Sequence, residues 1–570
     1  MAIQKSEPGL LQRYIPILQW LPGYNANTAK NDLSAGLTVG AMLVPQGMAY
    51  AFIAGLPAIY GLYASIVPLI LYAIFGTSRQ LAVGPVAMVS LLTAAGVGSI
   101  ATEGTDQYIQ LAIMAALMVG VFQFLMGTFR LGFVVQFLSH PVLSGFTSAA
   151  ALIIGLSQLK HLLGVDLERS KNIFIILSDA AMSLGQVNLV TLLVGLASIA
   201  TIILLRQWKR EFPSALVVVV LSTIVVWGFN LPEMGVKIVG DVPKGLPNFT
   251  VPEFSMADIK ALFPTVLAIS LVGFMESIAV AKAVANRHPE YKVDSNQELI
   301  GLGLANIFGG LFQSYPTTGG FSRTAVNEQA GAKTGMASII TAIVIALTVL
   351  FLTPLFYYLP KAVLAAIIMV AVFGLIDFKE AAFLWKTRKQ DFIMLLATFI
   401  GTLLLGIEEG IGIGVIISLV LVIYRSSRPH MAVLGRLPET DIYRNVNRFP
   451  EAKRTAEALM VRIDAALYFA NVDYIKDQLQ DLEHTEGEQL KHIIIDANGI
   501  NDVDSSAIHA LKELIKEYQQ RNVDWYFAAV KGPVRDMFDK TGIYDLVGRD
   551  HFYEDIHQLN KDLVGDKVLA

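Results

Sequence analysis

Cysteine is absent from the 570 residues of this chain. Its absence excludes disulfide bonds, thiolate metal sites and cysteine nucleophiles. Charged residues are scarce, at 16% of the sequence, whereas soluble domains carry roughly 25%. The net charge of −4 is small for this length, which argues against a nucleic-acid partner. Since 54% of the residues are hydrophobic, lipid is the expected surrounding of most of the chain.

Motifs that are typical of enzymes are missing too. No HExxH or GxSxG element occurs in a convincing context. The run Gly331-Ala332-Lys333-Thr334 resembles part of a phosphate-binding loop, but it lacks the adjacent Gly-Lys pair and a preceding strand. We therefore expect no enzymatic activity, no metal site and no cofactor.

Long apolar segments fill the first three-quarters of the chain. A helix needs about 20 apolar residues to cross a bilayer. The segments that fit this length are 33–53, 57–76, 83–100, 107–128, 137–160, 187–205, 212–230, 261–285, 297–313, 333–353, 358–375, 391–406 and 408–424. We therefore expect a polytopic membrane domain over 31–428, preceded by a cytoplasmic segment over 1–30 without a signal-peptide pattern.

Basic loops set the orientation of these segments. Clusters such as Lys386, Arg388 and Lys389 are placed in the cytoplasm by the positive-inside rule. With the clusters inside, one crossing is missing between 297–313 and 333–353, and the polar stretch 314–332 must supply it. The total becomes fourteen crossings, with both termini in the cytoplasm.

The polar crossing points to a binding site. Open backbone in lipid is costly, so 314–332 must be buried in protein or line a cavity. Seven crossings precede the long loop 231–257 and seven follow it, so the two halves have opposite orientations. The third crossing of each half is interrupted, by Ala82-Val83-Gly84-Pro85 and by Thr318-Gly319-Gly320-Phe321. Interrupted helices at matching positions of inverted halves mark a site near the membrane midplane.

The composition changes beyond residue 428. A linker is expected over 429–440, followed by a soluble α/β domain over 441–565. Short apolar runs alternate there with charged helical patterns. The expected strands are 458–463, 491–496 and 523–529, and the expected helices are 474–483, 505–519 and 532–540.

Several motifs resemble the SulP sulfate permeases, also called solute carrier family 26. They are Val44-Pro45-Gln46-Gly47-Met48-Ala49-Tyr50-Ala51, Gly55-Leu56-Pro57, Tyr60-Gly61-Leu62-Tyr63, Phe75-Gly76-Thr77-Ser78-Arg79, Val83-Gly84-Pro85, Asn296-Gln297-Glu298-Leu299 and Gly301-Leu302-Gly303. The C-terminal domain resembles a STAS domain. The resemblance implies fourteen segments in a seven-plus-seven inverted repeat and a homodimer that transports small anions. It also implies a core domain (segments 1–4 and 8–11) that moves against a gate domain (5–7 and 12–14).

An anion at the midplane needs compensating positive charge. Two half-helices whose N-termini face each other supply partial charge and free N–H groups. The residues at these two N-termini are Val86, Ala87, Phe321, Ser322 and Arg323. Arg323 adds a full charge, unless it serves a structural ion pair. A tight turn packed by glycines is the alternative for the interruptions.

The first segment offers two further candidates. Gln46 and Tyr50 lie four residues apart and share one face of the helix. By resemblance these positions line the anion site. The alternative is a hydrogen bond between helices for Gln46 and core packing for Tyr50.

Glu276 is the candidate for proton coupling. It lies in the middle of segment 261–285, and a carboxylate inside the membrane is a functional hypothesis by default. Proton-coupled sulfate members of the family carry a glutamate that matches it. The alternative is a permanent salt bridge to Arg323.

The preferred interpretation is therefore sulfate:proton symport in the cell membrane, by an elevator-type motion. Sodium-dependent bicarbonate transport, dicarboxylate transport and an anion exchanger or channel are the alternatives. Bicarbonate members use an aspartate and threonines for sodium, whereas this chain has Glu276-Ser277.

One residue of the soluble domain is a candidate for regulation. Asp504-Ser505-Ser506 opens a helix, where an N-cap is the plain interpretation. STAS domains of anti-sigma-factor antagonists are phosphorylated at a serine in this loop, so Ser505 is a regulatory candidate and a cytoplasmic regulator a possible partner.

Overall fold

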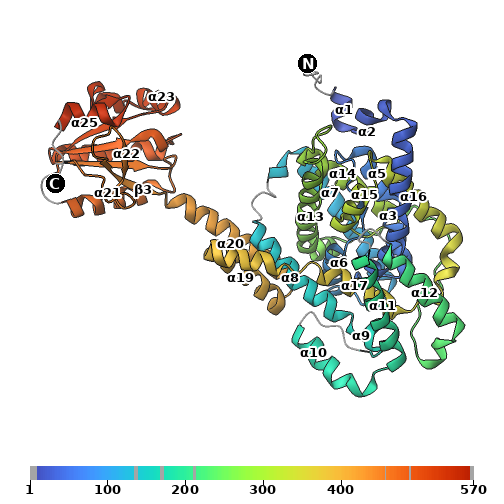
Figure 1. Ribbon diagram of the computed structural model, residues 1–570. Coiled ribbons are helices and arrows are strands. Elements are labelled where there is room, and N and C mark those ends of the chain that lie inside the picture. Colours follow the sequence, from blue (N-terminus) through green and yellow to red (C-terminus); the bar gives the residue numbers. More distant parts are fainter. Residues whose placement is uncertain are drawn as a thin grey trace. The chain divides into compact units, whose positions relative to one another are not determined.

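The computed structural model describes residues 9–133, 139–166, 173–208, 213–455, 457–486 and 490–564. Its two compact units are Met1–Ser418 and Leu419–Ala570 (Figure 1). The predicted segments and domains also include residues outside this description, namely 1–8, 134–138, 167–172, 209–212, 456, 487–489 and 565.

Every predicted crossing contains at least one helix. These helices are α3 (Ala26–Ile53), α4 (Ala58–Tyr63), α5 (Val67–Phe75), α6 (Ala87–Gly98), α7 (Asp106–Thr128), α8 (His140–Ser157), α11 (Leu189–Trp208), α12 (Ser214–Gly228), α13 (Met256–Ala285), α14 (Ser295–Leu311), α15 (Phe321–Gln329), α16 (Met336–Leu347), α17 (Lys361–Phe373), α19 (Lys389–Leu405) and α20 (Ile407–Ser427). Within the described residues, eight helical stretches are long and apolar enough to cross a membrane by length and composition, and some of them join consecutive helices, such as α4 with α5 and α17 with α18.

Some helices were not predicted. The short helices α1 (Leu10–Tyr14) and α2 (Ile17–Trp20) lie within the predicted cytoplasmic segment 1–30. Helix α3 also begins inside this segment, at Ala26. Two more helices, α10 (Ile173–Met182) and α18 (Phe378–Thr387), lie between predicted crossings, and a third, α9 (Leu159–Leu163), overlaps only the end of the crossing 137–160. At ten residues or fewer, each is too short to span a bilayer.

The two interrupted segments pair with each other. Strand β1 (Val83–Gly84) runs antiparallel to β2 (Thr318–Gly319), with Val83 opposite Gly319 and Gly84 opposite Thr318. Helix α6 follows β1 after two residues and α15 follows β2 after one. The polar crossing 314–332 is thus part strand and part helix, and its open backbone is buried against the matching segment of the other half.

Glycines allow α7 and α14 to approach closely. A Cβ atom on Gly120 would lie 2.5 Å from the backbone nitrogen of Ile307, and one on Gly303 would lie 2.6 Å from that of Phe124. Small residues at such contacts let helix backbones pack in lipid, where no hydrophobic driving force holds helices together.

Gly120→Val is therefore expected to destabilise the membrane domain. The added side chain must push α7 and α14 apart, and overpacking of this kind costs about 1–3 kcal/mol. Thermal unfolding in detergent should show a lowered midpoint. Gly228→Val is the control, because a Cβ atom there meets nothing within 4 Å. An unchanged midpoint for Gly120→Val would show that this contact is not tight.

The second unit contains a six-stranded sheet in the order β4-β3-β5-β6-β7-β8. Its strands are β3 (Met431–Arg436), β4 (Tyr443–Asn445), β5 (Ala458–Ile463), β6 (His492–Asp496), β7 (Asp524–Ala528) and β8 (Phe552–Tyr553). The helices are α21 (Val472–Glu486), α22 (Ser505–Gln520), α23 (Gly532–Thr541), α24 (Ile543–Val547) and α25 (Ile556–Val564). The predicted strands and helices are confirmed to within a few residues.

The predicted linker 429–440 is wrong. Strand β3 lies inside it and pairs with both β4 and β5. The run Met431-Ala432-Val433-Leu434 is apolar because it is buried in the sheet. The α/β domain therefore begins with β3.

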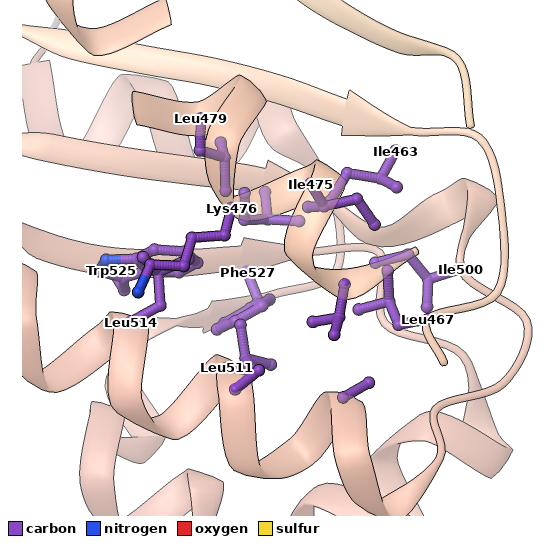
Figure 2. Close-up of a pocket in the computed structure, with 14 residues that line it drawn as sticks. Ile463, Leu467, Ile475, Lys476, Leu479, Ile500, Leu511, Leu514, Trp525 and Phe527 are labelled. Carbon is purple, nitrogen blue, oxygen red and sulfur yellow. The ribbon is translucent and has the colours of Figure 1, made fainter. Parts of the chain in front are cut away.

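Figure 2 shows the interior between α21, α22 and the sheet. The side chains there are apolar apart from Lys476, and they include Leu467, Leu511, Trp525 and Phe527. Most of them are buried members of one hydrophobic cluster. This space is the core of the domain.

Candidate functional site

The N-termini of α6 and α15 meet. Beside the β1–β2 pair, the Gly320 N–H donates to the Ala82 carbonyl at 3.0 Å. A Cβ atom on Gly320 would lie 3.2 Å from Cγ1 of Val86. Val86 and Gly320 are the residues that precede the two helices. The interrupted segments of the two halves thus lie side by side and form a single junction.

Neither helix is capped by a side chain at this place. By contrast, α3, α7, α13 and α14 are capped at their starts by Asn25, Thr105, Ser255 and Asp294. The first N–H groups of a helix have no partner within it. Those of α6 and α15 are therefore available to a ligand, and the helix dipoles favour an anion.

Arg323 lies at this junction with donors to spare. Its side chain is 1% exposed, and Nη1 donates to the Pro85 carbonyl. Nε and Nη2 have no hydrogen-bond partner. A buried donor without a partner is costly, so these two groups mark a place for an acceptor that binds from outside the protein.

Two glycines make room for the guanidinium. A Cβ atom on Gly320 would lie 2.9 Å from Nη2 of Arg323, and one on Gly84 would lie 3.5 Å from it. Gly84 also has a φ of +148°, which side chains with a Cβ atom rarely adopt. The space that the guanidinium needs, together with the positive φ of Gly84, explains why glycines occur at the two interruptions.

The two predicted residues of the first segment, Gln46 and Tyr50, lie on a helix that contacts this junction. Helix α3, which carries Gln46 and Tyr50, packs against both α6 and α15. Gln46 is 2% exposed and its Oε1 atom has no partner. Tyr50 is buried and interacts electrostatically with Arg323. We call Val86, Ala87, Phe321, Ser322 and Arg323, together with Gln46 and Tyr50, the half-helix site.

The site is open at the start of α15. Val86 and Ala87 are buried, whereas Phe321 is 63% exposed and Ser322 is exposed as well. The first turn of α15 is therefore exposed beside a buried arginine.

Glu276 lies on α13 and is half-buried. It interacts electrostatically with Arg323 and with Tyr50. Across the described ranges, no ion pair joins Glu276 to Arg323. The alternative of a permanent salt bridge therefore finds no support in the structure, and the role of Glu276 in proton coupling stays a prediction.

Other polar residues hold the crossing in place, and the sequence analysis missed them. Ser277 and Thr318 share a hydrogen bond of 2.6 Å, and Ser277 also accepts from the Gly319 N–H at 2.8 Å. Asn306 binds Thr317 through both ends of its amide, at 2.8 Å to the N–H and 3.0 Å to the carbonyl. Polar residues in the middle of apolar helices were the available signal.

Among the described residues of this unit, the carboxylates of Glu298 and Asp32 are buried, and both are satisfied within the protein. Glu298 accepts from the Tyr72 hydroxyl and from the Thr77 N–H, each at 2.6 Å. Asp32 accepts from the Lys333 N–H at 2.6 Å and from the Thr334 hydroxyl at 2.5 Å. Their full sets of donors fit a structural role, which distinguishes them from Glu276 and Arg323.

In the α/β domain, Ser505 is the first residue of α22 and is exposed. Asp504 supplies the cap, since its Oδ1 atom accepts from the Ala507 N–H at 2.8 Å. The Ser505 hydroxyl is therefore not needed as the N-cap. A regulatory role at this position stays a prediction, which detection of phosphate on Ser505 by mass spectrometry would test.

Comparisons with known proteins agree with these observations. The model of the sulfate permease family matches residues 30–398, and that of the STAS domain matches residues 449–559. The chain is 43% identical to sulfate transporter 4.1, chloroplastic, of Arabidopsis thaliana, over 95% of this chain and 81% of that protein. It is 36% identical to high affinity sulfate transporter 2 of Stylosanthes hamata, over 95% and 85%.

Solved structures show the same fold. The murine anion transporter Slc26a9, in its inward-facing state, superimposes with a TM-score of 0.89 at 27% identity, over 98% of this chain and 96% of that one. The transmembrane domain of the cyanobacterial bicarbonate transporter BicA shares the fold over 70% of this chain and 98% of that one, with a TM-score of 0.59 at 24% identity. These likenesses confirm the predicted fold class: an α-helical polytopic membrane protein with fourteen segments in a seven-plus-seven repeat, plus an α/β STAS domain. The chain belongs to the sulfate permease family of membrane transporters.

Proposed function

We propose that this protein transports sulfate together with protons and that the half-helix site binds the anion. The observation that carries the proposal is the junction of two uncapped helix N-termini with the open donors of buried Arg323. Backbone N–H groups and a guanidinium suit a tetrahedral oxyanion, which accepts hydrogen bonds in several directions. The relatives named as sulfate transporters support sulfate as the anion.

Glu276 would carry the coupled proton. Its carboxylate acts electrostatically on Arg323, so its negative charge opposes a divalent anion beside that arginine. Protonation of Glu276 removes this opposition, and binding of the anion in turn favours the protonated form. Such reciprocal linkage is what symport requires.

The remaining parts of the proposal concern motion and assembly. Segments 1–4 and 8–11 would carry the half-helix site as a core domain, in an elevator-type motion against a gate domain of segments 5–7 and 12–14. We expect a homodimer in the cell membrane with both termini in the cytoplasm, where the STAS domain can meet a regulator.

Uptake of radiolabelled sulfate into proteoliposomes tests the proposed function. We expect purified protein to accumulate sulfate when an inward proton gradient is imposed and to equilibrate it when no gradient is present. Uptake of bicarbonate that depends on sodium, with no uptake of sulfate under any gradient, would contradict the proposal. Unlabelled dicarboxylates that compete better than sulfate would also contradict it.

A further inference from the structure

A group of three lysines and one histidine lies where α8 ends and α17 begins. Lys160 and His161 lie on α9, which follows α8. Lys361 is the first residue of α17, and its N–H donates to the carbonyl of Lys237 at 2.9 Å. All three lysines lie close enough to His161 to act on it electrostatically, and the positive charge of the group belongs to the lysines. We call these four residues the outer cluster, since the positive-inside rule places this end of the domain outside.

The outer cluster has an excess of positive charge. Asp166 pairs with Lys237 at 2.5 Å, and the Asp166 side chain is 95% exposed. In the part of the chain that the structure describes, no other ion pair reaches these four residues. A concave region lined by one sign of charge raises the local concentration of ions of the opposite sign.

A small cavity adjoins this cluster. Its walls are His161, Lys361, the buried amide side chain of Gln158, Phe52 of α3, and the apolar Leu364, Ala365 and Ile368 of α17. At about 10 Å³ it has room for about one water molecule, so an oxyanion would lie at the lysines beside it. The Lys361 ammonium lies 6.0 Å from the centre of the Phe52 ring. No side chain caps the start of α17, so its first N–H groups keep their positive partial charge. The cavity thus joins α3 of the predicted core domain to α9 and α17 of the predicted gate domain.

The cavity and the half-helix site share helix α3. Phe52 follows Gln46 by six residues on α3, which corresponds to about 9 Å along a helix axis. An anion that enters from this end between α3 and α17 would meet the outer cluster before it meets Arg323.

We propose that the outer cluster is a second anion site, at which small divalent oxyanions collect with low affinity before they pass to the half-helix site. This inference rests on the proposed function, since it assumes that an oxyanion passes between α3 and α17. Such a site would act on the concentration dependence of transport and leave the translocation step itself unchanged.

Neutralisation of the lysines tests this site in the transport assay. Lys160→Gln and Lys361→Gln are each expected to raise the KM for sulfate about threefold or more, with Vmax nearly unchanged and a weaker dependence on ionic strength. Lys260→Gln, an exposed lysine at the same end of the domain, should behave as wild type. An unchanged KM would overturn the proposal. A lowered Vmax at constant KM would overturn it too, because it would place Lys361 in a contact that controls the motion.

A second experiment needs no transport. Because the chain has no cysteine, Phe52→Cys places a single thiol beside the outer cluster. An anionic methanethiosulfonate reagent should modify it about tenfold faster than a cationic one, after correction for their rates with a free thiol. The preference should disappear when Lys160→Gln and Lys361→Gln are added, and sulfate should slow the reaction.

The two experiments separate the two proposals. Equal rates for both reagents at Phe52→Cys, or no reaction with either, would overturn the outer site. A clear preference for the anionic reagent in a protein that takes up no sulfate would refute the proposed function alone.

Discussion

Arg323→Gln is expected to lower sulfate uptake at low sulfate concentration by about 100-fold. Arg323 offers two unpartnered donors and a full charge at the junction of α6 and α15. A hydrogen bond to a charged group contributes about 1.5–3 kcal/mol, and about 1.4 kcal/mol corresponds to a tenfold change in affinity. Initial rates of uptake into proteoliposomes measure the loss.

Two further variants make this result interpretable. Arg323→Lys keeps the charge but not the planar fork, so uptake between that of wild type and Arg323→Gln is expected. Arg388→Gln removes an exposed arginine between α18 and α19, and it should leave uptake unchanged. If Arg323→Gln elutes as a folded protein and transports as well as wild type, the arginine does not bind the anion.

Glu276→Gln is expected to abolish the response to a proton gradient while sulfate still equilibrates across the membrane. Glutamine keeps the size of the side chain but cannot take up a proton, and it resembles the protonated form that accompanies the anion. For one coupled proton, a gradient of one pH unit can raise the accumulation of sulfate at most about tenfold at zero membrane potential. This rise should be present in wild type and absent in Glu276→Gln.

The same measurement distinguishes the structural alternative. If Glu276 served only to hold α13 beside α15, Glu276→Gln would lose transport altogether, with and without a gradient. Glu253→Gln is the control, because Glu253 is an exposed carboxylate outside the helices. Accumulation that still follows the gradient in Glu276→Gln would exclude this residue as the proton site.

Much of the architecture could be predicted because lipid imposes strong rules. Apolar length locates the crossings and basic loops orient them. The same rules required the polar stretch 314–332 to cross, and it does so as β2 and α15. The helices α10 and α18 escaped prediction because they are too short to meet the length criterion.

The finer parts of the site depend on contacts between distant segments. The pairing of Val83 with Gly319 joins residues in opposite halves of the chain, and no local pattern fixes such a register. The role of Asn306 in holding Thr317 likewise follows only from the folded structure. Strand β3 was mistaken for a linker because its place between β4 and β5 is fixed only in the folded sheet, and β5 lies more than twenty residues further along the chain.

The location of the bound anion tests the central claim most directly. Selenate resembles sulfate in shape and charge, and crystals grown with it allow selenium to be located by anomalous scattering. We expect a selenium peak within hydrogen-bond reach of Arg323 and of the first N–H groups of α6 and α15. A protein that transports selenate but shows its ordered selenium only elsewhere would contradict the half-helix site.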